Sequence, residues 1–423
     1  TVGDTEISAL EFNYEYYSAI NNLYSQYGSY ASLIGLNFSS PLKSQTCYFD
    51  SNITWHDYFV NMAKSQLEET YLLYSKAASQ QFEMTQESKD SLESSIAKLE
   101  TAATDADMKV NEYLSGLYGE NMTMDDYREF ATRRLIAADF YTAYTDGLEY
   151  SDEAIDKFYD DNKFTYDRVD YYSYTVKVKE GAEESPEEIA NKIKLASTDV
   201  NSFIESIKAR ENADTFKAET YFKDDVSYTK GDQTSEWLFD HTRVPGEVTV
   251  IRATSSGTTT YTVVCFVERS RETYQLATMR HILFEVSDKT NEDGSAMKDA
   301  EGNTLTDADE QKAAAEALLK QWQDGEKTAD SFAALVKDNS DDAGSVANGG
   351  LYEDFDKTTM VAPITEWIWK DGRQPGDCEI VETDFGYHIV YFVSYGEYKW
   401  KSDVINALKV EDYEKYLETL KTE

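Results

Sequence analysis

The feature that most constrains the fold of this chain is an internal repeat. The segment SEWLFDHTRVPGEVTVI begins at Ser235, and the segment TEWIWKDGRQPGDCEIV begins at Thr365. Glu-Trp and Arg-x-Pro-Gly recur in both segments at an offset of 130 residues. Downstream, YTVVCFV from Tyr261 matches YHIVYFV from Tyr387. Self-similarity at this distance indicates that two copies of one α+β unit follow each other in the chain.

The two copies differ at their histidines. Aligning YYSYTV with MRHILF places Ser173 opposite His281, and the downstream match places Thr262 opposite His388. His281 lies inside MRHILFEV, which otherwise has the pattern of a buried strand. A lone histidine in such a strand is usually a core residue with a backbone hydrogen bond. Its function therefore depends on what else the second copy carries.

Length and charge limit the fold and the partners. The chain has 423 residues, which predicts about three domains. Its formal net charge of −40 excludes nucleic acid as a partner, because little could neutralise the phosphates. No apolar run approaches the roughly 18 residues that a membrane-spanning helix requires. Cys47, Cys265 and Cys378 lack the spacing of a metal site and are interpreted as buried thiols.

The first 160 or so residues are predicted to be helical. Ser8 with Glu11, and Thr123 with Asp126, have the spacing of helix-capping boxes. One apolar helical face is predicted to contain Trp55, Phe59, Met62, Ala63, Leu67, Tyr71, Tyr74 and Ala78. From about Asp170, strand-like and helical segments alternate, and a helix over residues 402–421 ends the chain.

The second copy carries four motifs in order: MRHILFEV, SFAALVKDNSDD, NGGLYEDF and TDFGYHIV. Over about residues 275–397 they resemble the parvulin family of peptidylprolyl cis–trans isomerases. VGDTEIS and SDEAIDKFYDDN are similar to the chaperone domain of extracytoplasmic foldases of the survival-protein (SurA) and PrsA types.

The resemblance implies an α+β multidomain fold. We expect a helical chaperone-like domain over residues 1–162, against which helix 402–421 packs back. A degenerate parvulin-like domain over 165–272 and an isomerase domain over 275–397 should follow. Each should be a four-stranded antiparallel sheet with flanking helices.

The resemblance also implies a site. His281 and His388 should share a hydrogen bond on adjacent strands, with the Thr383 hydroxyl nearby. Asp342 should lie at the rim, beside the reacting amide. The proline-binding residues should be Leu351, Met360, Ile364 and Phe385. Ile364 stands where the family usually has Phe, and GGLYEDF departs from the commoner Gly-Gly-Asp-Leu-Gly, which puts the rate in question.

The chemistry suits these residue types. Rotation about an X–Pro bond is slow because amide resonance sets a barrier of about 20 kcal/mol. No bond is broken, so no nucleophile, metal or cofactor is expected. A thousandfold acceleration needs about 4 kcal/mol, which a few polar groups over an apolar floor can provide. No Arg or Lys cluster follows His281, so phosphoserine-proline substrates are not expected.

An acidic insertion follows the first strand of the second copy. Asp293, Asp299, Glu301 and Asp307 offer oxygen ligands for calcium, but they lack the order of an EF-hand. Hairpin turns at Gly294 and Gly302 are the favoured interpretation.

We therefore expect a folding factor that isomerises X–Pro bonds in unfolded secreted polypeptides. The chain begins with Thr1, which we interpret as the result of a removed leading segment. Together with the resemblance, this predicts a cell-surface or secreted location, anchored by that segment. Two alternatives stay open. One is a holdase chaperone with an inactive parvulin-like module, which the Ile364 substitution favours. The other is an acidic surface scaffold, which the tyrosine-rich helices permit.

Overall fold

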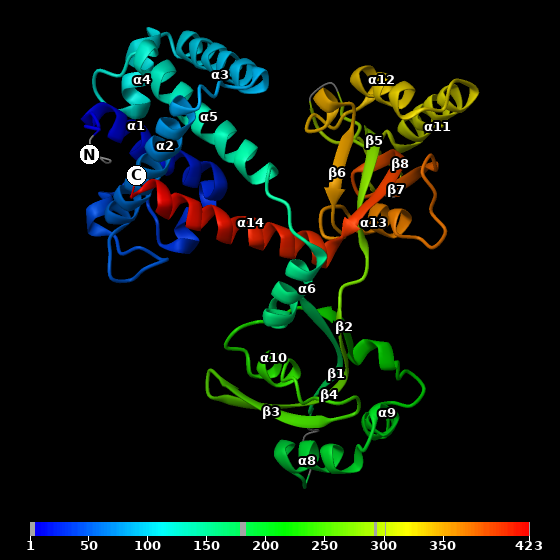
Figure 1. The fold of residues 1–423 in the computed structure, drawn as a ribbon. Helices are drawn as coiled ribbons and strands as arrows, with labels where there is room; N and C mark the ends of the chain where they lie inside the picture. The colour runs from blue at the N-terminus through cyan, green and yellow to red at the C-terminus, as the bar shows by residue number, and fades with distance from the viewer. Residues whose placement is uncertain (1–4, 178–182, 292–293, 301, 423) are drawn as a thin grey trace. The chain divides into compact units, whose positions relative to one another are not determined.

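A computed structural model describes residues 5–177, 183–291, 294–300 and 302–422. The chain divides into two compact units, drawn in Figure 1. The first combines Thr1–Ser151 with Asn406–Glu423, and the second is Asp152–Ile405. Among the described residues, no helix has both the length and the apolar character needed to cross a membrane.

The first unit, called here the helical unit, is built from amphipathic helices. They are α1 (Ala9–Tyr27), α2 (Trp55–Ser79), α3 (Gln86–Asp105), α4 (Val110–Tyr118), α5 (Met124–Asp146) and the C-terminal part of α14 (Lys399–Leu420), with short 3-10 turns η1 (Gly28–Ile34) and η2 (Leu42–Ser44). Trp55 and Phe59 of α2 are fully buried against the η1 segment. Burial of such large side chains contributes roughly 1.5–3 kcal/mol each.

The end of α14 belongs to the core of the helical unit. Tyr413 and Leu420 are buried in one cluster with Leu73 of α2 and Phe140 of α5. The Tyr413 hydroxyl also donates to the Glu69 carboxylate. The C-terminal helix therefore packs on α2 and α5, more than 250 residues earlier in the sequence.

Two details of the helices differ from expectation. Ser8 caps α1 by accepting from the Glu11 amide at 3.0 Å, but the Glu11 carboxylate does not return to the cap. The Glu11 carboxylate is instead buried, and it accepts a hydrogen bond from the Tyr71 hydroxyl at 2.7 Å and pairs with Arg133. On α2, Met62 is 42% exposed, because the buried stripe moves towards Leu73 and Ala77 where α5 and α14 pack.

The second unit contains two four-stranded antiparallel sheets. The first has the order β2-β1-β4-β3 and the second the order β6-β5-β8-β7. Their strands are β1 (Asp167–Thr175), β2 (Phe222–Val226), β3 (Val248–Ser255), β4 (Thr258–Arg271), β5 (Gln275–Glu285), β6 (Leu351–Phe355), β7 (Cys378–Thr383) and β8 (Gly386–Tyr398). Corresponding strands therefore have the same neighbours in both copies, as the repeat predicts.

Helices cover both sheets in the same way. One face of the first sheet packs against α8 (Pro186–Ala196) and α9 (Val200–Lys208), and the matching face of the second packs against α11 (Ala308–Asp324) and α12 (Ala329–Asn339). The opposite faces pack against α10 (Gln233–Leu238) and α13 (Ala362–Ile368). We call residues 165–272 the first repeat and 275–397 the second repeat. Helix α6 (Asp152–Asp161) and the short α7 (Lys163–Tyr166) precede the first repeat in this unit.

Strand register supports the sequence alignment of the repeats. Thr175 pairs with Thr262 in the first sheet, and Leu283 pairs with His388 in the second. Two residues earlier on the first strand of each pair stand Ser173 and His281. Ser173 and Thr262 thus occupy the positions that the two histidines have in the second repeat.

The shared Arg-x-Pro-Gly motif builds the same corner twice. The Arg243 guanidinium lies 4.8 Å from the Trp237 ring centre, and that of Arg373 lies 3.5 Å from the Trp367 ring centre. The glycine that follows has a positive φ in both copies, 88° at Gly246 and 95° at Gly376. Its amide donates to the carbonyl of a phenylalanine on the central strand, at 2.8 and 2.9 Å. This Arg–Trp stack and glycine corner fix where the third strand of each sheet begins.

The hairpin after that corner is longer in the first repeat. The β7–β8 ladder ends at the pair Thr383–Gly386, whereas β3–β4 continues through Thr254–Thr259 to Ser255–Thr258. Ser256 and Gly257 close it with positive φ values of 49° and 79°, the geometry of a two-residue type I′ turn. The segment Tyr261–Val267 is aligned with Tyr387–Val393, and the extra residues lie at the hairpin tip.

The acidic insertion forms turns. Short bridges join Thr290 to Ala296 and Lys298 to Thr304, and Gly294 and Gly302 have positive φ values at the bends. Asp293 and Glu301 lie outside the described residues. Among the residues that are described, no group of three or more acidic, histidine or cysteine side chains is arranged to hold a metal ion.

Candidate active site of the second repeat

The two histidines meet on one face of the second sheet. Successive side chains on a strand point to opposite faces, so His281 and His388 share the face of Met279 and Val390, which packs against α13. His281 Nδ1 and His388 Nδ1 are 3.1 Å apart, and the rings are nearly parallel. Their exposed fractions are 4% and 5%. The structure therefore gives the contact expected from the sequence.

The loop after α12 carries Asp342 to this pair. On the edge of β5 that faces away from β8, the short strand β6 pairs only with the first part of β5. The loop after α12 supplies the hydrogen bonds for the rest of that edge. The Asp341 amide donates to the Leu283 carbonyl at 2.9 Å, and the Leu283 amide donates to Ser340 Oγ at 3.1 Å. The Glu285 amide donates to the Asp341 carboxylate at 2.9 Å. These bonds hold the following residue, Asp342, beside His281.

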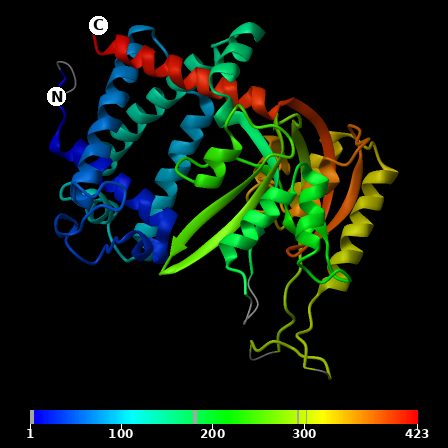
Figure 2. The same cartoon turned by 90° about the horizontal axis from the view of Figure 1, so that it is seen from below.

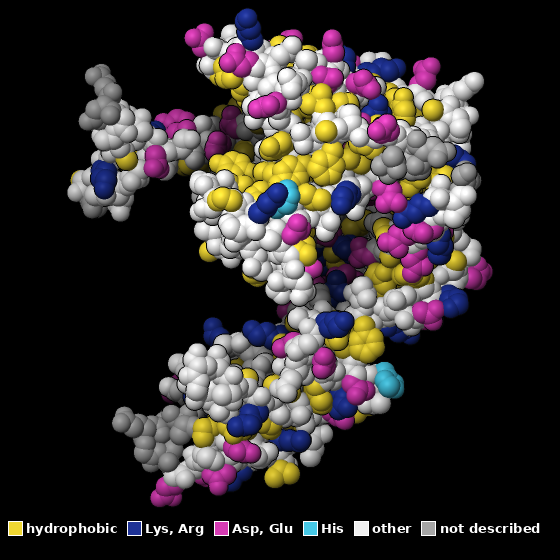
Figure 3. Space-filling view, turned by 90° about the vertical axis from the view of Figure 1, so that its left-hand side faces the viewer, with side chains coloured by type: hydrophobic (Ala, Val, Ile, Leu, Met, Phe, Trp, Pro, Cys, Tyr) yellow, Lys and Arg dark blue, Asp and Glu magenta, His cyan; other side chains and the backbone are white. Residues whose placement is uncertain are grey.

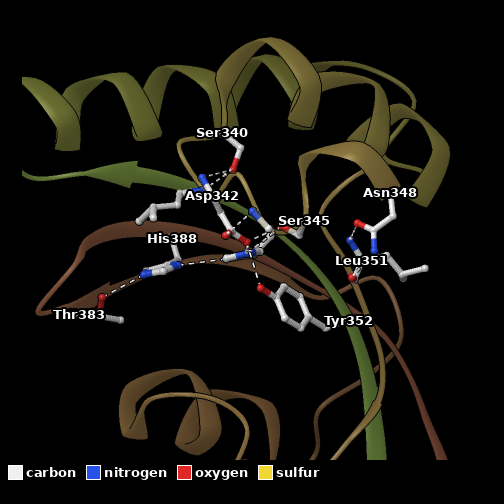
Figure 4. A network of polar contacts seen from close by, with 11 residues as sticks. Ser340, Asp342, Ser345, Asn348, Leu351, Tyr352, Thr383 and His388 are labelled. Carbon is white, nitrogen blue, oxygen red and sulfur yellow. Dashed lines mark hydrogen bonds and ion pairs between the residues drawn. The ribbon is translucent and has the colours of Figure 1, made fainter. Parts of the chain in front are cut away.

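Asp342 is the acceptor at the end of the network in Figure 4. Its Oδ2 lies 2.7 Å from His281 Nε2 and accepts from the Tyr352 hydroxyl at 3.0 Å. The Ser345 hydroxyl donates to the same oxygen. The Asp342 side chain is 21% exposed. The expectation of a rim residue is therefore incomplete, because Asp342 also holds three neighbouring groups in place.

Burial and these contacts set the charge states. Burial lowers the pKa of His281 despite the nearby carboxylate. Burial, and then the neighbouring His281, lower the pKa of His388 to about 4. Burial works to raise the pKa of Asp342, but the bonds from Ser345 and His281 outweigh it and lower the pKa to about 2. At neutral pH the site therefore contains two neutral imidazoles and one carboxylate.

These charge states assign a direction to every hydrogen bond. An ionised carboxylate only accepts, so His281 carries its proton on Nε2 and leaves Nδ1 free to accept. His388 then donates from Nδ1, and its Nε2 accepts from the Thr383 hydroxyl at 2.9 Å. Thr383 Oγ1 in turn accepts from the Phe385 amide at 3.1 Å. One continuous chain runs from the β7–β8 turn to Asp342, with each member donating to the next.

The double glycine of NGGLYEDF is required by close packing. The His281 amide donates to the Gly350 carbonyl at 2.9 Å. A Cβ on Gly350 would lie 2.3 Å from the His281 carbonyl oxygen, and its φ is +72°. Arg280 Nη1 donates to the carbonyls of Asn348 and Gly349 at 2.9 and 2.7 Å. The arginine of MRH therefore fastens the glycine loop to β5.

The predicted proline-binding residues do not all lie together. Met360 and Ile364 belong to the apolar cluster on the face of the histidines, but Ile364 is only 1% exposed. Phe385 is 56% exposed in the β7–β8 turn. The Leu351 side chain points away from the Asp342 network in Figure 4. Ile364 is therefore buried within the apolar cluster, and Leu351 faces away from the network.

Sequence reasoning missed Ser345 and Tyr352. The Tyr352 hydroxyl reaches Asp342, and its ring meets His281 edge-on with centroids 5.3 Å apart. Strand alternation could have found it, because neighbours on a strand face opposite ways and Tyr352 follows Leu351. Ser345 is 2% exposed, and its hydroxyl lies 3.3 Å from His281 Nε2. It lies in an irregular loop, where no periodic pattern marks it.

Comparison with known proteins finds a known domain over the residues of the second repeat. Residues 281–394 match the family model described as Rotamase, PPIC-type PPIASE domain. The foldase protein PrsA of Exiguobacterium sibiricum is 32% identical over 105 residues, which is 25% of this chain and 33% of that protein. The chain spans about a third of the length of the curated relatives that it matches.

Solved structures of similar proteins were also found. PrsA from Bacillus subtilis matches 88% of this chain and 88% of its own, with 14% identity and a TM-score of 0.33. A structure from Campylobacter jejuni, of the SurA-like chaperones PEB4 and Cj1289, matches 99% of this chain and 93% of its own, with 15% identity and a TM-score of 0.16. The chain carries a PPIC-type parvulin domain over residues 281–394 and is similar in sequence to the foldase PrsA.

Proposed function

We propose that the second repeat isomerises X–Pro bonds in unfolded or partly folded polypeptides, and that the chain serves as a folding factor outside the cytoplasm. The observation that carries this proposal is the hydrogen-bonded chain from Thr383 through both histidines to Asp342, beside an apolar cluster. The match of residues 281–394 to the PPIC-type domain supports it.

The proposed chemistry needs rigidity more than reactivity. The twisted amide of the transition state has less double-bond character, so a site of fixed shape and low polarity favours it over the planar forms. His281 and Tyr352 form one wall, and their orientation is set by Asp342. The imidazole rings of His281 and His388 are neutral, and both nitrogens of each ring are hydrogen-bonded. Neither ring is therefore expected to transfer a proton to the substrate.

A protease-coupled assay tests the proposal on the full chain. A proline tetrapeptide that chymotrypsin cleaves only in its trans form should isomerise faster with the wild type. The double variant His281→Ala/His388→Ala should fall to near the uncatalysed rate. The first repeat is not expected to supply activity of its own, because it has Ser173 and Thr262 at the positions of the two histidines. A wild type without acceleration would reject isomerase activity, and full activity in the folded double variant would reject this site.

A holdase chaperone is the second candidate, and the helical unit supplies the observation in its favour. Exposed aromatic side chains stand in the segment between α1 and α2, where Tyr30, Tyr48 and Phe49 are 69%, 67% and 48% exposed. Figure 3 shows hydrophobic side chains gathered on the face of this unit that it presents. Such amphipathic surfaces suit unfolded clients. Suppressed aggregation of a proline-free client, without isomerase turnover, would favour the holdase.

A further inference from the structure

Edge strands expose unpaired backbone groups, and three of the four sheet edges in the described part of the chain carry charged side chains. Charged side chains protect them in the usual way: Lys223, Asp224 and Asp225 on β2, Glu353 and Asp354 on β6, and Glu379 and Glu382 on β7. The ladders of β2 and β6 are also broken by register shifts. The fourth edge strand, β3, has eight residues in unbroken register, no proline, and a single charge at Arg252.

The hydrogen-bond pattern shows which groups of β3 point outward. Hydrogen-bonded pairs alternate along an antiparallel ladder, and a two-residue turn is closed by such a pair. Ser255–Thr258 closes the turn, so residues 249, 251, 253 and 255 bond to β4. At the start of β3, the Phe266 amide of β4 donates to the Glu247 carbonyl at 2.9 Å, so there too the odd-numbered residues bond to β4. The amides and carbonyls of Val248, Val250, Arg252 and Thr254 therefore point away from the sheet.

Hydroxyl side chains are frequent on this sheet. On the sheet face that carries the histidines in the second repeat, the first repeat has hydroxyl side chains: Thr175 and Thr262 lie 3.0 Å apart through their Oγ1 atoms. Thr254 and Thr259 form a similar contact at 3.0 Å near the hairpin tip. In Figure 2 the long β3–β4 hairpin is the green pair of strands. The extra pairs of this hairpin lengthen the exposed edge.

We propose that the outer edge of β3 binds an extended segment of an unfolded polypeptide as an added strand. Main-chain bonds give such binding without a sequence motif, which suits a protein that meets many clients. A second copy of this chain is a poor occupant, because each copy carries a net charge of −40. The occupant is therefore a neutral or basic extended segment. The identification of that segment as a client rests on the proposed function.

The test separates backbone donors from side chains. In Arg252→Pro/Thr254→Pro, two outward amides are lost while the bonds to β4 are kept, as proline permits on an edge strand. In the matched control Arg252→Val/Thr254→Val the same side chains are removed and both amides stay. The probe is a fluorescein-labelled, proline-free peptide of eight residues, with alternating Thr and Val and a Lys at each end. Its binding to the full chain is measured by fluorescence anisotropy.

We expect the wild type and the Val control to bind alike, and the Pro variant to bind about tenfold more weakly or worse. A probe N-methylated at two adjacent central residues, which blocks both of its edges, should bind equally weakly. Equal binding by a folded Pro variant, or none by the wild type, would overturn the proposal. So would a wild-type dimer in sedimentation that the Pro variant abolishes, because the occupant would then be a second copy.

This result is independent of isomerase activity. The probe contains no proline, so its binding does not use the site in the second repeat. Turnover of the proline tetrapeptide should be the same in the wild type, the Pro variant and the Val control. A chain that binds the probe but shows no turnover would reject the proposed isomerase and retain the strand-binding edge.

Discussion

Lowering the pH from 7 towards 4 should destabilise the second repeat, because His388 stays neutral in the fold while the unfolded chain takes up a proton. The unfolded imidazole has its ordinary pKa of 6.5, and burial lowers the folded value to about 4. The unfolded state therefore binds more protons between these values, and stability is lost as the pH falls through that window. A difference of about 2.5 pH units corresponds to at most about 3 kcal/mol from His388.

The measurement uses the small number of histidines in this chain. With four histidines, selective ¹⁵N-histidine labelling gives a simple spectrum, and the variants His281→Gln and His388→Gln identify the two buried rings. We expect both rings to stay neutral at pH 5.5, with the proton on Nε2 of His281 and on Nδ1 of His388. Urea unfolding from pH 7 to 4 should show the loss of stability, which should shrink in His388→Gln. His241→Gln, at a side chain 88% exposed, is the control and should keep the full pH dependence.

Two results would refute this reasoning. If the folded pKa of His388 were 6.5 or higher, burial would not control its charge. If His281 carried its proton on Nδ1, the direction of the hydrogen-bonded chain would be wrong. The carboxylate acts in a separate window, because the lowered pKa of Asp342 removes stability only as the pH falls from about 3.8 towards 2.

Three further predictions concern single elements. Asp342→Ala should lower the free energy of unfolding by about 1–3 kcal/mol and reduce turnover, since three donors lose their acceptor. Thermal unfolding and the proline assay measure the two effects, with the exposed Asp384→Ala as control. Unchanged stability would contradict the prediction. Gly350→Ala should unfold the second repeat at a lower temperature, because its Cβ would lie 2.3 Å from a carbonyl oxygen; a wild-type melting curve would count against the close packing. Removing residues 406–423 should lower the melting temperature of the helical unit, since Tyr413 and Leu420 leave its core; an unaltered calorimetric profile would show that this packing contributes nothing.

The sequence alone allowed the repeat and the histidine pair to be predicted. A shift of one residue on a strand moves every side chain to the other face, so aligned strands also predict which residues share a face. That rule pairs His281 with Ser173, and His388 with Thr262, without a structure. The same rule places Leu351, which pairs with Arg280, on the face opposite His281, so the assignment of Leu351 that the resemblance implied does not follow from strand alternation.

Contacts that depend on tertiary packing were not predictable in this way. Glu11 has the spacing of a capping partner, yet it pairs with Arg133, which lies more than 100 residues later. The local pattern is the same for a cap and for a buried acid, and only the approach of α5 decides between them. Met62 fits the helical period of α2, but the buried stripe changes direction where α14 packs.

The Arg–Trp stack is present in both repeats, and this separates two kinds of residue in the chain. Both copies have the stack and the glycine corner, whereas the first repeat has Ser173 and Thr262 where the second has its two histidines. Two copies of one fold in the same chain must share the contacts that the fold requires, whereas contacts that serve only one copy need not be shared. Comparing the two repeats therefore separates residues that both copies use to form the same fold, such as the corner, from residues found only in the second repeat, such as the two histidines for which we propose a role in isomerisation.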